Sequence, residues 1–208
     1  FEHAVLLPMP RAKADVTLRL FDNHGSVCAE HRFLLEPSDI LIRRQRPSGT
    51  SWRYIHKGGD SRECIDVVIM AEGYAKKDMR LFHKDAQAAC DAILSAPPFS
   101  QFADRLNIIA VDSVSEDSGV SEPLKGTWRD TAIKSHFSTF YSDRYLTSEN
   151  VHDIHDLLSG IPYEHIIILA NTDTYGGGGI YNSYTLTTAH HSKFRPVVVH
   201  EEKDKVTE

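Results

Sequence analysis

The stretch Ile65-Asp-Val-Val-Ile-Met70 sets the architecture of this protein. It is a continuous apolar run in which Asp66 is the one charged residue, a pattern typical of a strand buried on both faces. Residues 78–96 follow with apolar side chains at helical spacing, and Pro97 and Pro98 end that pattern. The apolar positions of this expected helix are Met79, Phe82, Ala86, Ala89 and Ile93. The sequence therefore predicts a buried strand that leads into a helix.

Further along the chain, strand and helix patterns continue to alternate. Residues 106–111 and 165–170 are apolar runs that predict two more buried strands, and residues 148–159 predict a short helix between them. Beyond the glycines at 176–179, residues 181–189 alternate between apolar and polar side chains and predict an edge strand. This order favours an α/β fold with a mostly parallel, twisted sheet and an edge strand that is preceded by glycines.

The first 57 residues follow a different pattern. Apolar and polar side chains alternate over residues 16–20 and 27–35, on either side of the turn-forming residues 22–25, which predicts a β-hairpin. Two strands bury too little apolar surface to be stable alone. We therefore expect residues 1–57 to be the C-terminal part of an N-terminal β-domain with a linker, and residues 58–208 to belong to the α/β domain.

Composition excludes two classes of function for this stretch. The chain has 23 Lys and Arg against 29 Asp and Glu, a net charge of −6, and lacks the clustered cations of a protein that binds nucleic acid through its phosphates. Its apolar runs are far shorter than the roughly 18 residues that span a bilayer. We therefore expect no nucleic-acid partner and no membrane insertion in this stretch.

Four consecutive glycines, Gly176 to Gly179, have more than one interpretation. Glycine-rich loops can bind phosphates, but here neither a GxGxxG spacing nor a following GK[ST] is present, and the expected next element is a strand. A glycine run beside an edge strand instead leaves main-chain donors and acceptors uncovered, and such an edge can pair with a peptide strand. A plain flexible loop is an equally good interpretation of these residues alone.

Other clusters of polar residues favour ordinary surface structure. His152 and His155 lie on the face of the expected helix opposite its apolar residues, where a solvated surface is expected. The adjacent His190 and His191 would point to opposite faces of a strand and could not chelate one ion together. The acidic loop at 112–123 follows a buried strand but has no EF-hand spacing, so an ordinary acidic turn is expected.

The last candidate is Val197-Val-Val-His200-Glu201. His and Glu are the first two residues of the zinc motif HExxH, in which two histidines hold the metal and the Glu polarises a metal-bound water. The second half of the motif is not matched, because charged residues follow and Asp204 stands at the position of the second His. Taken alone, this His-Glu pair favours the start of a polar helix.

Several stretches together resemble one known family. They are Ile65 to Tyr74, Asp117 to Ser121, Asn171 to Asn182 and Val197 to Glu201. Over residues 60–201 the chain resembles the immunoglobulin-A peptidase family of zinc metallopeptidases, found mostly in gut bacteria. The resemblance implies an α+β zincin-like catalytic domain preceded by the end of a β-sandwich domain. It also implies a secreted, periplasmic or cell-surface enzyme that hydrolyses peptide bonds of protein substrates.

The resemblance also implies roles for individual residues. His200 corresponds to a zinc ligand and Glu201 to the catalytic general base. The strand that would bind the substrate comprises Gly177, Gly178, Gly179, Ile180, Tyr181 and Asn182. After Glu201 the chain departs from the family, so we expect a domain truncated at its active-site helix, with zinc bound only by a complete enzyme. The alternative is a catalytically inactive module that binds a peptide or another partner.

Overall fold

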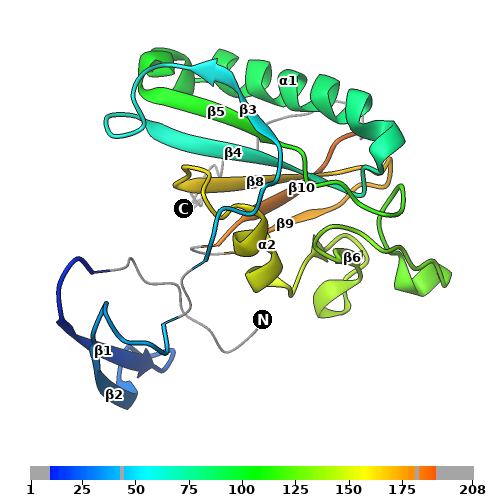
Figure 1. The fold of residues 1–208 in the computed structure, drawn as a ribbon. Helices are drawn as coiled ribbons and strands as arrows, with labels where there is room; N and C mark the ends of the chain where they lie inside the picture. Colours follow the sequence, from blue (N-terminus) through cyan, green and yellow to red (C-terminus); the bar gives the residue numbers. More distant parts are fainter. Residues whose placement is uncertain (1–9, 43–44, 181–182, 191–208) are drawn as a thin grey trace, which may run out of the picture. The chain divides into compact units, whose positions relative to one another are not determined.

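The computed structural model describes residues 10–42, 45–180 and 183–190. It divides into two compact units, with the division between Gln45 and Arg46 (Figure 1). The first unit contains the hairpin of β1 (Ala14–Phe21) and β2 (Val27–Leu35), which pair antiparallel from Ala14 and Leu35. The predicted hairpin is confirmed, whereas its origin in a β-sandwich domain stays a prediction.

The second unit is built on a six-stranded mixed sheet with the order β3-β5-β4-β8-β10-β9. Its strands are β3 (Trp52–Lys57), β4 (Ile65–Glu72), β5 (Leu106–Val111), β8 (His165–Ala170), β9 (Gly177–Gly179) and β10 (Thr185–Thr188). The central strands β5, β4, β8 and β10 are parallel to one another, and the outer strands β3 and β9 pair antiparallel with β5 and β10. This confirms the predicted mixed α/β fold with a largely parallel sheet.

Strand β4 is apolar from Val67 to Ala71 because both faces of the sheet are covered. On one face, Ile69 and Ala71 pack with the apolar stripe of α1 (Met79–Ser95). On the other face, Val68 and Met70 belong to a second cluster that includes residues of α2 (Val151–Leu157). Figure 1 shows α1 lying along one side of the sheet. Side chains that alternate between two cores explain why the sequence reads as an unbroken apolar run.

A long connection, residues 112–150, joins β5 to α2. It contains the short antiparallel pair β6 (His136–Phe137) and β7 (Leu146–Thr147). The remaining short elements are the 3₁₀ helices η1 (Lys76–Asp78), η2 (Phe99–Gln101), η3 (Ala103–Arg105), η4 (Pro123–Lys125) and η5 (Thr139–Tyr141). Within the described ranges, no helix combines the length and apolar character needed to cross a membrane.

Two predictions about the ends of the sheet were wrong. The expected edge strand at 181–189 is represented by β10, which lies inside the sheet, while the glycines themselves form the edge strand β9. The reason is a tight return, in which the Ile180 N–H donates to the Tyr184 carbonyl at 2.8 Å, so that the glycines pair back on the following strand. At the opposite edge, β3 belongs to the six-stranded sheet, although its residues had been assigned to the preceding domain.

Candidate functional site

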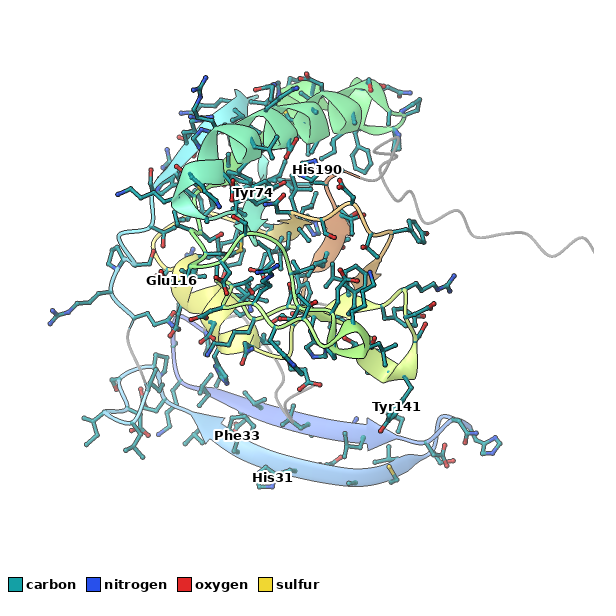
Figure 2. All side chains as sticks on the ribbon, turned by 90° about the vertical axis from the view of Figure 1, so that its right-hand side faces the viewer. His31, Phe33, Tyr74, Glu116, Tyr141 and His190 are labelled. Atoms are coloured by element: carbon teal, nitrogen blue, oxygen red, sulfur yellow. The ribbon has the colours of Figure 1, made fainter. Side chains whose placement is uncertain are left out.

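The carboxyl ends of the central strands bring together polar residues that are distant in sequence. Such ends are where binding sites of open α/β sheets collect. Tyr74 follows β4, Asn171 follows β8 and His190 follows β10, and Figure 2 shows Tyr74 and His190 close together. Their ring centroids are 6.3 Å apart. The Tyr74 hydroxyl donates to Asp85 of α1 at 2.8 Å, and burial, reinforced by that carboxylate, raises the pKa of Tyr74.

The hydrogen bonds of Asn171 assign the tautomer of His190. The Asn171 side-chain amide donates to the Gly73 carbonyl at 2.9 Å, so its Oδ1 is the atom that lies 3.0 Å from His190 Nε2. Since this oxygen can only accept, Nε2 carries the proton. The Asp85 carboxylate lies 3.6 Å from the same nitrogen. These contacts tie the end of β10 to both β8 and α1.

Glu72, at the end of β4, is a fully buried carboxylate. It accepts hydrogen bonds from the Thr131 hydroxyl at 2.6 Å, the Ile133 N–H at 3.1 Å, and the N–H and hydroxyl of Ser135 at 2.9 and 2.6 Å. Burial raises the pKa of Glu72, although these donors act in the opposite direction. The carboxylate therefore holds residues 131–135 of the long connection against the central strand.

The acidic loop after β5 borders a hollow of about 690 Å³. Its charged lining residues are Lys76, Lys77, Glu116, Asp117 and Arg129. Asp117 accepts a hydrogen bond from the Asp130 N–H at 2.8 Å, and the Ser118 hydroxyl donates to Asp78. These contacts within the protein fit the predicted acidic turn, and the mixture of charges favours neither a cation nor an anion.

The glycine edge strand presents main chain without side chains. On its inner side β9 lies beside β10, where Gly178 is opposite Leu186 and Gly179 is opposite Thr185. On the outer side, the Gly177 N–H donates to the Arg144 carbonyl at 3.1 Å. Since main-chain groups two residues apart in a strand point to the same side, the N–H and C=O of Gly179 also point outward. Of the other residues predicted to bind substrate, Ile180 is half-buried, and Tyr181 and Asn182 lie outside the described residues.

The predicted zinc ligand His200 and general base Glu201 also lie outside the described residues. Among the residues that the structure describes, no three His, Cys, Asp or Glu side chains come together in a way that could hold a metal ion. The roles of His200 as a zinc ligand and of Glu201 as a general base therefore stay predictions.

The histidines of α2 do not share one environment. His152 is exposed, as predicted, but His155 is half-buried, with Nδ1 2.7 Å from the Tyr163 hydroxyl. Burial lowers the pKa of His155, and the neighbouring His152 lowers it further. The prediction of a solvated surface was wrong for His155, because the chain beyond α2 returns and places Tyr163 against its ring.

Sequence reasoning missed Glu72, Tyr74, Asp85 and Asn171. One signal was present, because Glu72 and Asn171 stand at the ends of predicted parallel strands, where polar residues of different strands meet. Nothing in the local pattern indicated that Asp85 of α1 would reach Tyr74, since that contact depends on how the helix packs.

Comparisons with known proteins add the family. A family model described as IgA Peptidase M64 matches residues 54–206, which is most of the chain. No curated protein matches the chain. The matched range begins within β3 and includes the other five strands of the sheet, both α-helices and the predicted residues His200 and Glu201. The chain therefore belongs to the IgA peptidase M64 family, whose members are metallopeptidases that act on protein or peptide substrates.

Proposed function

We propose that this chain functions in a zinc-dependent, zincin-like metallopeptidase and carries residues of its catalytic site. The observation that carries the proposal is β9, an antiparallel edge strand made of glycines alone, at the end of a largely parallel sheet. An extended peptide binds such an edge by adding a strand, and glycines let its main chain approach closely. Family membership supports a peptide as the occupant.

The outward N–H and C=O of Gly179 are the groups that would hold the peptide. Gly179 is exposed, so its main chain is accessible from solvent. Gly177 is different, because its N–H is already used by Arg144. The main-chain bonds of Gly179 would fix the direction of the bound peptide.

The chemistry of the proposed site rests on residues close to the end of the sequence. A bound zinc ion would supply a Lewis acid and lower the pKa of a coordinated water. His200 would be one of its ligands, and the Glu201 carboxylate would accept the proton of the attacking water and return it to the leaving amine. A catalytic zinc site uses three protein ligands, and His200 would supply one of them.

Metal analysis of the full-length protein together with its intact mass tests this proposal. We expect about one zinc per chain and cleavage of a denatured protein such as casein, with cleavage lost in Glu201→Gln and zinc retained. A protein without zinc that binds peptide but does not cleave it would refute the enzyme and support the inactive binding module. Unchanged cleavage by Glu201→Gln would refute the role of Glu201.

A matched pair of substitutions tests the edge strand. Gly179→Pro removes the outward N–H and is tolerated on an exposed edge, whereas Gly179→Ala keeps the N–H and enters open space. We expect kcat/KM for a peptide substrate to fall about tenfold in Gly179→Pro and to stay within about twofold in Gly179→Ala, as for the loss of one hydrogen bond. Equal activities in the two variants would rule out pairing at Gly179.

Export from the cell is a further part of the proposal. It follows from the resemblance to secreted enzymes, because their protein substrates lie outside the cell. Fractionation of the native source tests it, with the protein expected in the medium, the periplasm or at the cell surface. Its recovery in the cytoplasm alone would contradict this part without affecting the proposed chemistry.

A further inference from the structure

The outer side of β9 is closed at one end and open at the other. At Gly177, Tyr145 forms a parallel β-bridge, and the Gly177 N–H donates to the Arg144 carbonyl at 3.1 Å. At Gly178, a Cβ would point to one face of the sheet and lie 2.8 Å from Thr147 Cγ2, so the segment passes under that face. Gly179 is exposed. Within the described residues, the segment Arg144–Thr147 therefore occupies the place of a neighbouring strand beside Gly177 and leaves Gly179 exposed.

This segment is fixed to the body of the unit. Leu146, Thr147 and Ser148 are fully buried. The Ser148 N–H donates to the Tyr184 hydroxyl at 2.7 Å, and that hydroxyl donates back to the Ser148 carbonyl. The Ser148 hydroxyl donates to the carbonyl of Ile133, whose N–H is held by the buried Glu72. A peptide that displaced the segment would have to break this buried network.

We propose that Arg144–Thr147 is a stop on the substrate edge, so that a bound peptide pairs with Gly179 and leaves the edge before it reaches Gly177. This inference rests on the proposed peptidase function, since it concerns how the same strand holds its substrate. Pairing is limited to one residue of the described edge, because the outward N–H of Gly177 already has an acceptor. Longer pairing would need both Gly177 and Gly179.

The stop restricts the class of substrate. A peptide in extended conformation along the whole of β9 would collide with the main chain of Tyr145, which forms the bridge to Gly177, and would compete with Arg144 for the Gly177 N–H. Peptides that turn away or end on the Gly177 side of the paired residue avoid both costs. Substrates are therefore segments that bend or end near the site of pairing, and lengthening a peptide on that side adds no affinity.

A backbone N-methyl scan of a peptide that the full-length protein cleaves tests the stop. Each variant peptide lacks one N–H, and the scissile amide is left unmodified. We expect a single sensitive position, where kcat/KM falls about tenfold because the bond to the Gly179 carbonyl is lost. Lengthening the peptide on the Gly177 side should change KM by less than about twofold.

Other outcomes separate the two proposals. A second sensitive position, two residues away on the Gly177 side, would show that the peptide also pairs with Gly177 and would overturn the stop. Cleavage with no sensitive position would overturn pairing at β9 altogether. Failure of the full-length protein to cleave any peptide would refute the proposed function, and the stop would fall with it.

Discussion

The two outer strands of the sheet are protected in different ways. β3 pairs antiparallel with β5, has an irregular register between Tyr54 and His56, and carries the exposed cations Arg53 and Lys57. β9 pairs antiparallel with β10 but consists of three glycines and carries no side chains. Its protection comes instead from Arg144–Thr147, which lies beside Gly177.

This difference shows what a binding edge requires. Charged side chains and register irregularities keep an exposed strand from pairing with other chains. β3 has both, and they lie within the strand itself. β9 has neither, so it stays available for pairing wherever the segment Arg144–Thr147 does not cover it. An edge without protection of its own, partly covered by a distant segment, is suited to take a short strand at one defined place.

Removing the Glu72 carboxylate should loosen the segment Arg144–Thr147 that lies beside β9. Of the substitutions described, it should have the largest effect on the free energy of unfolding. Glu72→Ala leaves two hydroxyls and two N–H groups of residues 131–135 without their buried acceptor. We expect the free energy of unfolding to fall by about 3 kcal/mol, measured by urea denaturation. A loss below about 1 kcal/mol would show that the long connection does not depend on Glu72.

A side chain at Gly176 should disturb the segment Arg144–Thr147 only at the Gly177 end of β9. Its Cβ would lie 2.3 Å from Phe137 Cε1 and 2.8 Å from the Arg144 carbonyl, so Gly176→Ala should destabilise the protein by about 2 kcal/mol. Gly179→Ala, at the open end of the same strand, is the matched control and should change stability by less than about 0.5 kcal/mol. Equal losses in thermal unfolding would contradict the difference between the two ends.

The pH dependence of stability tests the burial of Glu72. Its pKa is raised above the ordinary value of 4.5, so the folded state holds the proton more tightly than the unfolded state does. The contribution of this group is therefore greatest at low pH and is lost as pH rises from about 4.5 through the raised pKa. Glu72→Gln has no such proton, so the difference in unfolding free energy between wild type and this variant should vary with pH in that window. A difference in unfolding free energy that does not change with pH would refute the raised pKa of Glu72.

Changing β3 should have the smallest effect on folding and a visible effect on association. The double substitution Arg53→Val and Lys57→Val removes exposed cations and should alter the free energy of unfolding by less than about 0.5 kcal/mol. Without these charges, β3 becomes an apolar edge that can pair with another copy. Light scattering should detect oligomers of the Val double variant. The control, with Gln at both positions, should form fewer oligomers. A monomeric double variant would show that the irregular register protects this edge.

Prediction from sequence succeeded where one element carries its own pattern. β4, β5 and β8 appear as apolar runs because both faces of the sheet are covered, and α1 shows the apolar spacing that faces the sheet. The predicted helix at 148–159 is also present, as the shorter α2.

Prediction from sequence failed where the local pattern is weak or where a feature depends on a contact between residues that are distant in sequence. β3 alternates poorly and lies next to a polar stretch, so it was assigned to a linker region. The glycines carry no side-chain pattern, so their place at the edge depended on the return at Ile180 and Tyr184. The burial of His155 depended on Tyr163, which α2 itself does not contain.

Local sequence was thus enough for the α/β class, the central strands and the resemblance to a peptidase family that the comparison bears out. These features depend on side chains a few residues apart, where periodicity and motif are visible. The position of the edge, the closure of Gly177, the opening at Gly179 and the burial of Glu72 come from tertiary contacts. Such contacts join residues far apart in the chain, and no local pattern records which of them will meet.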